Sequence, residues 1–299
     1  MKTYLECIPC FFRQVIETLK ICDVDEPTRY QTVLELADKL KTFSLESSPP
    51  EIAREIHKIL KKTTGDDDLF REIKIKSNNL VLSIYDRLKQ KIYSSKDKLL
   101  TAVELAIVGN IIDYGVKKTL DVESEISKIL DVEHKAIKAT DERLFEYKKF
   151  KETLINSNVV LYLADNAGEI VFDRLLIELI KSEYPDKKII FAVKEKPIIN
   201  DALMKDALDC RIDEVAELIS SGSDAPGTVL SLCSDEFIRI YRSADMIISK
   251  GQGNFEALTD ADRPIFFLCM VKCQVIADDI SKTIAECEIG NVILYHHNP

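Results

Sequence analysis

The chain has 299 residues and a formal net charge of −10, from 41 Lys and Arg against 51 Asp and Glu. This acidic balance argues against a nucleic-acid partner, because binding to phosphate backbones depends on clustered cations. A hydrophobic content of 46% and a charged content of 31% are ordinary for a folded globular protein. We expect two domains from the length.

No apolar stretch approaches the roughly 18 residues that a membrane span needs, and the first residues carry no apolar leader. Eight cysteines in so long a chain are too sparse for a disulfide scaffold. We therefore expect a cytoplasmic protein that has reduced thiols and no membrane partner.

The first half of the chain, residues 1–150, is predicted to form a helical N-terminal domain. Apolar residues recur there at steps of three and four, the period of a helix with one buried face. One predicted helix begins at Pro49 and Pro50, since proline suits the first turn. The expected helices include stretches at 33–40, 49–60, Leu69 to Gln90, Leu99 to Tyr114, Glu123 to Leu130 and Asp141 to Lys151.

The second half, residues 151–299, is predicted to form a Rossmann-like α/β domain. Short runs rich in Val, Ile and Leu alternate there with helical segments, as in a parallel sheet that is covered on both faces. The expected strands are Val159 to Ala164, Lys188 to Val193, Met246 to Ser249, Pro264 to Leu268 and Asn291 to Tyr295. The fold class is therefore α/β, a three-layer parallel-sheet domain beside an all-α domain.

Polar side chains follow the first two expected strands. Asp165 and Asn166 come directly after the first, and Asp201 follows the second. Their oxygens are ligands that a hard divalent cation prefers, and ligands of such folds bind at strand ends. Lys194, at the end of the second strand, could hold an anionic substrate. Each group could instead cap a helix or shape a turn.

A third strand end carries Lys250 before the glycine-rich turn Gly251-Gln252-Gly253. Backbone amides of such a turn can converge on an oxyanion. In the helical half, Asn110 and Asp113 are three residues apart, so they share one helix face. They either bond within the helical domain or reach the α/β site from it.

Cys7 and Cys10 form a Cys-x-x-Cys pair at the start of a predicted helix, where the helix dipole would lower a thiol pKa. The pair could bind a second metal or cycle between redox states. Buried structural thiols are the other interpretation.

Taken together, these motifs resemble the DUF89 family, the damage-control phosphatases with an ARMT1-like domain. The resemblance is carried by Cys-Ile-Pro-Cys, Gly109 to Asp113, Asp165-Asn166-Ala167-Gly168-Glu169, Lys194 to Asp201, and Lys250-Gly-Gln-Gly-Asn254, in this order. The paired cysteines are similar to those of its archaeal and bacterial branch. The family's last motif often reads Lys-Gly-Asp-Leu-Asn, and this chain differs from it at Gln252 and Gly253.

The resemblance implies a metal-dependent phosphatase that hydrolyses a small phosphorylated metabolite, such as a sugar phosphate, a nucleotide or a phosphopantetheine-like compound. It implies that Asp165, Asn166 and Asp201 hold Mg²⁺, Mn²⁺, Co²⁺ or Ni²⁺, and that Lys250 contacts phosphate. Asp165 and Asp201 are the expected catalytic residues, through an activated water or an aspartyl-phosphate on Asp165. The expected substrate contacts are Lys250, Lys194, Glu169, Asn254, Asn110 and Asp113.

Two other functions fit the same sequence. A Rossmann-like layer could bind S-adenosylmethionine for a carboxyl methyltransferase, which would need no metal. A non-catalytic metal or redox module could be built on Cys7 and Cys10.

Overall fold

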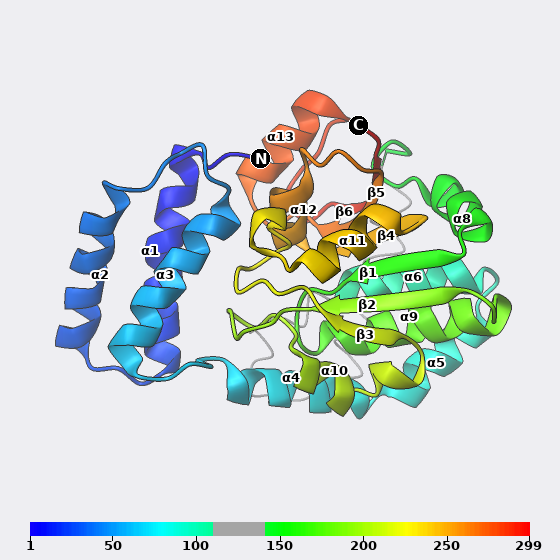
Figure 1. Ribbon diagram of the computed structural model, residues 1–299, viewed down its shortest axis with the longest axis horizontal. Coiled ribbons are helices and arrows are strands. Elements are labelled where there is room, and N and C mark those ends of the chain that lie inside the picture. Colours follow the sequence, from blue (N-terminus) through cyan, green and yellow to red (C-terminus); the bar gives the residue numbers. More distant parts are fainter. Residues whose placement is uncertain (110–140) are drawn as a thin grey trace.

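A computed structural model describes residues 1–109 and 141–299. Within these ranges helices fill the first half of the chain and strands alternate with helices in the second (Figure 1). The elements in chain order are η1 (Leu5–Cys7), α1 (Ile8–Ile21), α2 (Glu26–Leu40), α3 (Pro49–Thr64), α4 (Arg71–Leu82), α5 (Tyr85–Ser94), α6 (Lys98–Val108), α8 (Tyr147–Asn156), β1 (Val159–Leu163), α9 (Glu169–Glu183), β2 (Lys188–Val193), α10 (Met204–Asp209), η3 (Ile212–Glu214), β3 (Glu217–Ser220), η4 (Leu230–Leu232), α11 (Asp235–Ser243), β4 (Met246–Lys250), α12 (Gln252–Leu258), β5 (Ile265–Met270), α13 (Gln274–Thr283) and β6 (Val292–His297).

The sheet has six strands in the order β3-β2-β1-β4-β5-β6. Strands β1 to β5 are parallel, as predicted, whereas β6 runs antiparallel to β5 and closes one edge. The prediction missed β3, which has four residues and is only partly buried, so its sequence lacks a continuous apolar run. The strand order reverses between β1 and β4, and ligands of such sheets bind outside the carboxyl ends of the strands at this point.

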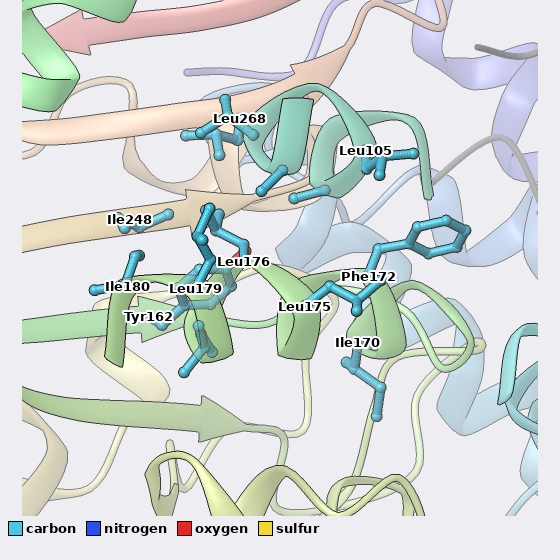
Figure 2. Close-up of a cluster of buried hydrophobic side chains, with 14 of the residues drawn as sticks. Leu105, Tyr162, Ile170, Phe172, Leu175, Leu176, Leu179, Ile180, Ile248 and Leu268 are labelled. Carbon is cyan, nitrogen blue, oxygen red and sulfur yellow. The ribbon is translucent and has the colours of Figure 1, made fainter. Parts of the chain in front are cut away.

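Both faces of the sheet are covered, which explains why its central strands are apolar throughout. Val160 and Tyr162 of β1 face one core, and Leu161 and Leu163 face the other. The first core includes side chains of α6, α8 and α9, and Figure 2 shows the Leu and Ile side chains of α9 against Tyr162 and Ile248. The second core includes side chains of α11, α12 and α13. The predicted three-layer α/β class is confirmed.

The helical half contributes to two different cores. Helices α1, α2 and α3 pack on one another around Val15, Leu36 and Ile56 and form a separate bundle (Figure 1). Helices α4 to α6 instead join the sheet core, where α6 contacts α9 along its length. Gly109 permits this approach, because a Cβ at that position would lie 2.6 Å from the Phe172 ring. A division into two domains at residue 150 stays a prediction.

Two predicted helices differ from the observed ones. The stretch Leu69 to Gln90 is broken between α4 and α5, where the Ser83 hydroxyl donates to the Leu80 carbonyl at 2.6 Å and competes with the helix ladder. Residues 141–146 are not helical, because Glu146 and Leu144 hydrogen-bond to Leu294 of β6. Helix α3 begins at Pro49 as predicted. The predicted helix at Glu123 to Leu130, with Asn110 and Asp113, lies outside the described residues.

In the described ranges no helix is both long and apolar enough to cross a bilayer.

Candidate active site at the carboxyl ends of the strands

The loops that follow β1 and β2 are bonded to each other, which brings the predicted metal ligands together. Asn166 and Asp201 pair as an antiparallel bridge, and the Ala202 N–H donates to the Asp165 carbonyl at 2.8 Å. Asp165 is 8% exposed and Asp201 is 3% exposed. The structure therefore places Asp165, Asn166 and Asp201 side by side, although the two aspartates are 36 positions apart in the sequence.

Asp165 also lies against the loop that follows β4. Gly251 has φ +78°, and a Cβ added there would be 1.9 Å from the Asp165 Oδ2 atom. Glycine is needed for both reasons, since other residues rarely adopt this φ and none would leave room for the carboxylate. Gly251, the glycine after Lys250, thus leaves the space that the Asp165 carboxylate occupies.

Helix α4 supports the turn that carries these ligands. The Gly168 N–H donates to the Asn78 side-chain oxygen at 2.6 Å, and Asn78 in turn donates to Asp206 at 3.0 Å. Gly168 itself has φ +82°, the left-handed region that favours glycine. Asn78 is therefore a contact from the helical half that the sequence interpretation did not identify.

Burial and crowding raise the pKa values of the ligand carboxyls. The pKa of Asp165 is well above its usual range, because the group is buried and because Glu169 and Asp201 are close; Lys272 and Lys194 act in the opposite direction. Burial raises the pKa of Asp201 to about 6, while Lys194 opposes the shift. Grouped acidic side chains with raised pKa values are typical of a site that a cation neutralises.

Lys250 lies behind the ligands and is ion-paired inside the protein. Its Nζ atom is 2.6 Å from Glu169 Oε1 and 2.6 Å from Asp173 Oδ1, and the side chain is fully buried. Asp173 Oδ1 also accepts the Tyr162 hydroxyl at 2.6 Å. For Lys250 to contact phosphate as expected, its ion pairs with Glu169 and Asp173 would have to break.

Glu169 connects this buried network to the ligands. Its Oε2 atom accepts from the Asn166 amide nitrogen at 3.3 Å, and that nitrogen also donates to Asp165 Oδ2 at 2.8 Å. Because the amide group is planar, its oxygen is turned away from these two carboxylates. Glu169 thus contacts Asn166 in the structure, and the substrate contact expected of Glu169 stays a prediction.

Asn254 and Lys194 also lie behind the pocket wall. The Asn254 amide donates to the carbonyls of Ala164 and Lys250, at 3.1 and 2.6 Å, and accepts the Thr228 hydroxyl at 2.8 Å. This fully buried side chain therefore ties the ends of β1 and β4 together and has no surface for a substrate. Lys194 is 4% exposed, and its Nζ atom is 3.7 Å from Asp201 Oδ2.

A pocket of about 320 Å³ opens in front of the ligands. The carboxyl ends of the strands form one wall through Asp165, Asn166 and Asp201, and helices α1 and α3 form the opposite wall through Phe11, Pro50 and Ala53. Lys272, which follows β5, lines it too. The sequence interpretation missed Lys272, although it stands after an expected strand as Lys194 and Lys250 do.

The predicted cysteine pair lies on the same pocket. Cys7, Cys10 and Cys273 all line it. Burial raises the pKa of the Cys7 thiol, so the expectation that the helix dipole would lower it is wrong for Cys7. In the described part of the chain no three His, Cys, Asp or Glu side chains are grouped as a metal site. A cysteine-centred metal site gains no support from this arrangement.

The predicted cation set fits the residues present, because it combines two carboxylates with an amide. Asp201 Oδ2 is buried and has no hydrogen-bond partner among the described residues. Three oxygen-bearing side chains at one strand edge match the preference of Mg²⁺ and Mn²⁺ for oxygen ligands.

Comparison with known proteins adds independent findings. A profile for the damage-control phosphatase ARMT1-like domain matches residues 3–287. The chain is 36% identical to a damage-control phosphatase of Pyrococcus horikoshii, over 94% of both chains, and 33% identical to one of Archaeoglobus fulgidus, over 96% of this chain and 98% of the other. The crystal structure of a DUF89 family protein from Pyrococcus horikoshii superposes with a TM-score of 0.85 at 32% identity, covering all of both chains.

Proposed function

The chain belongs to the ARMT1-like damage-control phosphatase family, and from this membership we propose that it hydrolyses small phosphomonoesters with a divalent cation held by Asp165, Asn166 and Asp201. The phosphatase activity follows from the family and its named relatives. The observation that supports the cation site is the convergence of these three side chains at the point where the strand order reverses.

The residues of the site have distinct tasks in this proposal. Asp165, Asn166 and Asp201 would hold the cation, and Glu169 orients the Asn166 amide. When bound, a divalent cation supplies positive charge to a phosphoryl oxygen and lowers the pKa of a water molecule. Asp165 and Asp201 would accept a proton or attack phosphorus, and the wall of α1 and α3 would shield the substrate from solvent on one side.

Sugar phosphates, nucleotides and phosphopantetheine-like compounds are the proposed substrate classes. They share a phosphomonoester and differ in the group that would face Phe11, Pro50 and Ala53. Specificity among them is therefore expected to depend on the helical wall.

The test is phosphate release from a panel of these compounds, with a chelator or with Mg²⁺, Mn²⁺, Co²⁺ or Ni²⁺. The wild type is compared with Asp165→Asn, which keeps the size of the side chain and removes its charge. We expect release that needs a metal and falls at least about 10³-fold in the variant. Release that is equal with the chelator, or equal in the variant, would exclude the proposed site.

A further inference from the structure

The two loops that carry the proposed cation ligands are held by a buried side chain of the helical half. Asp165 and Asn166 stand in the loop after β1, and Asp201 stands in the loop after β2. Helix α4 contacts both α9 and α10, the helices that follow these loops. Asn78 of α4 is 3% exposed and takes part in both contacts. One residue of the helical half is therefore bonded behind both groups of ligands.

Asn78 uses both ends of its amide group. Its Oδ1 atom accepts the Gly168 N–H at 2.6 Å, and its Nδ2 atom donates to Asp206 Oδ1 at 3.0 Å. The other oxygen of Asp206 accepts the Leu203 N–H at 3.0 Å. Gly168 and Leu203 each stand two residues after a proposed ligand. A continuous path of three hydrogen bonds thus links the two ligand loops through α4.

The two partners of this side chain require an amide. The Gly168 N–H needs an acceptor and the Asp206 carboxylate needs a donor, and an amide group supplies both. The turn also packs directly on α4, because a Cβ at Gly168 would lie 2.9 Å from the Ser77 Cβ atom. Lys74, one helical turn before Asn78, is buried as well, and its Nζ atom is 3.7 Å from Asp206 Oδ2. The position of Asn78 is therefore closely restrained.

We propose that Asn78 is a positioning residue that restrains the distance between the two ligand loops and so limits the size of the cation that the site accepts. This inference rests on the proposed function, because it takes Asp165, Asn166 and Asp201 as the ligands. Two connections restrain the loops, the backbone bridge between Asn166 and Asp201 and the path through Asn78. Without the second connection the loops can turn about the first, and the spacing of the two carboxylates is less restricted.

The consequence is a change in cation preference. Mg²⁺ needs short bonds in a nearly octahedral arrangement, whereas Ca²⁺ accepts longer bonds and irregular geometry. A site with restrained ligands favours the smaller ion, and a looser site favours it less.

The test measures Mn²⁺ affinity by electron paramagnetic resonance, and the affinities of Mg²⁺ and Ca²⁺ by competition with Mn²⁺. For Asn78→Ala we expect Mn²⁺ affinity to fall about 10- to 100-fold, as for other residues that orient metal ligands. The ratio of Mg²⁺ affinity to Ca²⁺ affinity should fall by at least about threefold. A loss of folded protein would lower both affinities equally and would leave this ratio unchanged.

A second variant, Asp206→Asn, tests the far end of the path and keeps the volume of the side chain. It has one acceptor oxygen where the carboxylate has two, so Asn78 and the Leu203 N–H compete for it. The ratio of Mg²⁺ affinity to Ca²⁺ affinity should fall here too, by less than in Asn78→Ala.

The matched control is Tyr85→Phe. It removes another hydrogen bond between the helical half and α9, the one that Tyr85 donates to Glu178 further along that helix. Mn²⁺ affinity and the ratio of Mg²⁺ affinity to Ca²⁺ affinity should both stay within about twofold of the wild type.

An unchanged ratio in both Asn78→Ala and Asp206→Asn would overturn this inference and leave the proposed function intact. An equal change of the ratio in Tyr85→Phe would overturn it as well. A wild type that binds Mn²⁺ with the expected dependence on Asn78 but releases no phosphate would refute the proposed hydrolysis and leave the inference standing. A wild type that binds no Mn²⁺ would overturn both.

Discussion

The two walls of the pocket are built differently. The wall at the sheet edge is polar and closely packed. The Asp165 carboxylate lies in the space left by the missing side chain of Gly251, and Asn166 is hydrogen-bonded to Glu169, which is ion-paired with the buried Lys250. The opposite wall is mostly apolar, and it belongs to the bundle of α1 to α3, which has its own core. From this difference we expect the chemistry to depend on the α/β core and the choice of substrate to depend on the separate layer of helices.

Among changes that leave every proposed cation ligand in place, the largest effect should come from one that touches the sheet-edge wall. In Gly251→Ala the new Cβ would lie 1.9 Å from Asp165 Oδ2, so the carboxylate must move. We expect a loss of Mn²⁺ affinity and of phosphatase activity of about 10² to 10³-fold, because small displacements at a reacting centre are costly. Metal titration and phosphate release measure both.

The matched control is Gly290→Ala. Gly290 has φ +93°, a comparable backbone strain, but a Cβ there meets nothing within 4 Å. Equal loss of metal binding in the two variants would show that backbone strain, and not the contact with Asp165, explains the effect.

The second prediction concerns stability behind the same wall. Lys250→Met would leave the carboxylates of Glu169 and Asp173 buried without their cation. We expect the free energy of unfolding to fall by about 3 to 5 kcal/mol. Denaturant unfolding measures it, and Lys58→Met, which removes a half-exposed pair with Glu55, should change it by less than about 1 kcal/mol. Similar decreases in the free energy of unfolding in the two variants would contradict the conclusion that Lys250 stabilises the fold through its buried ion pairs.

The third prediction is a pH dependence of the metal-free protein. Burial raises the pKa values of Asp173 and Asp201 to about 6, so the folded state holds protons that the unfolded state has released. Stability should therefore decrease as the pH rises from about 4 through 6, with Tm falling by roughly 5 °C. Calorimetric scans at pH 5 and 7 measure this shift.

A divalent cation should reverse the trend, because it favours the ionised carboxylates. Mn²⁺ is expected to raise Tm more at pH 7 than at pH 5. A metal-free Tm that rises across this interval would contradict the raised pKa values.

The smallest effect is expected on the helical wall. Gln14 lines the pocket and is 3.2 Å from the His57 ring nitrogen, so it is tied to the bundle core. Gln14→Ala should change KM by less than about tenfold, to different extents for different substrates, with Mn²⁺ affinity unchanged. Kinetics on the phosphoester panel would check this. A uniform loss across all substrates would show that the helical wall takes part in the chemistry.

The sequence alone determined the α/β class, five of the six strands and the position of the candidate ligands at strand ends. It could do so because buried parallel strands are apolar over their whole length and are therefore visible in the sequence. Asp165 and Asn166 come just after the first of these strands, and Asp201 comes in the loop after the second. The family motifs and their order were also visible in the sequence, and the match over residues 3–287 confirms the family.

Only the tertiary structure decided which side chains face the pocket. Lys250, Glu169 and Asn254 stand in strand-end motifs as Lys272 does, yet the first three are buried among internal partners and Lys272 is at the surface. Strand ends place a residue at the correct edge of the sheet but do not set the direction of its side chain. That direction follows from packing between distant segments, such as α9 against β4, which no local pattern encodes.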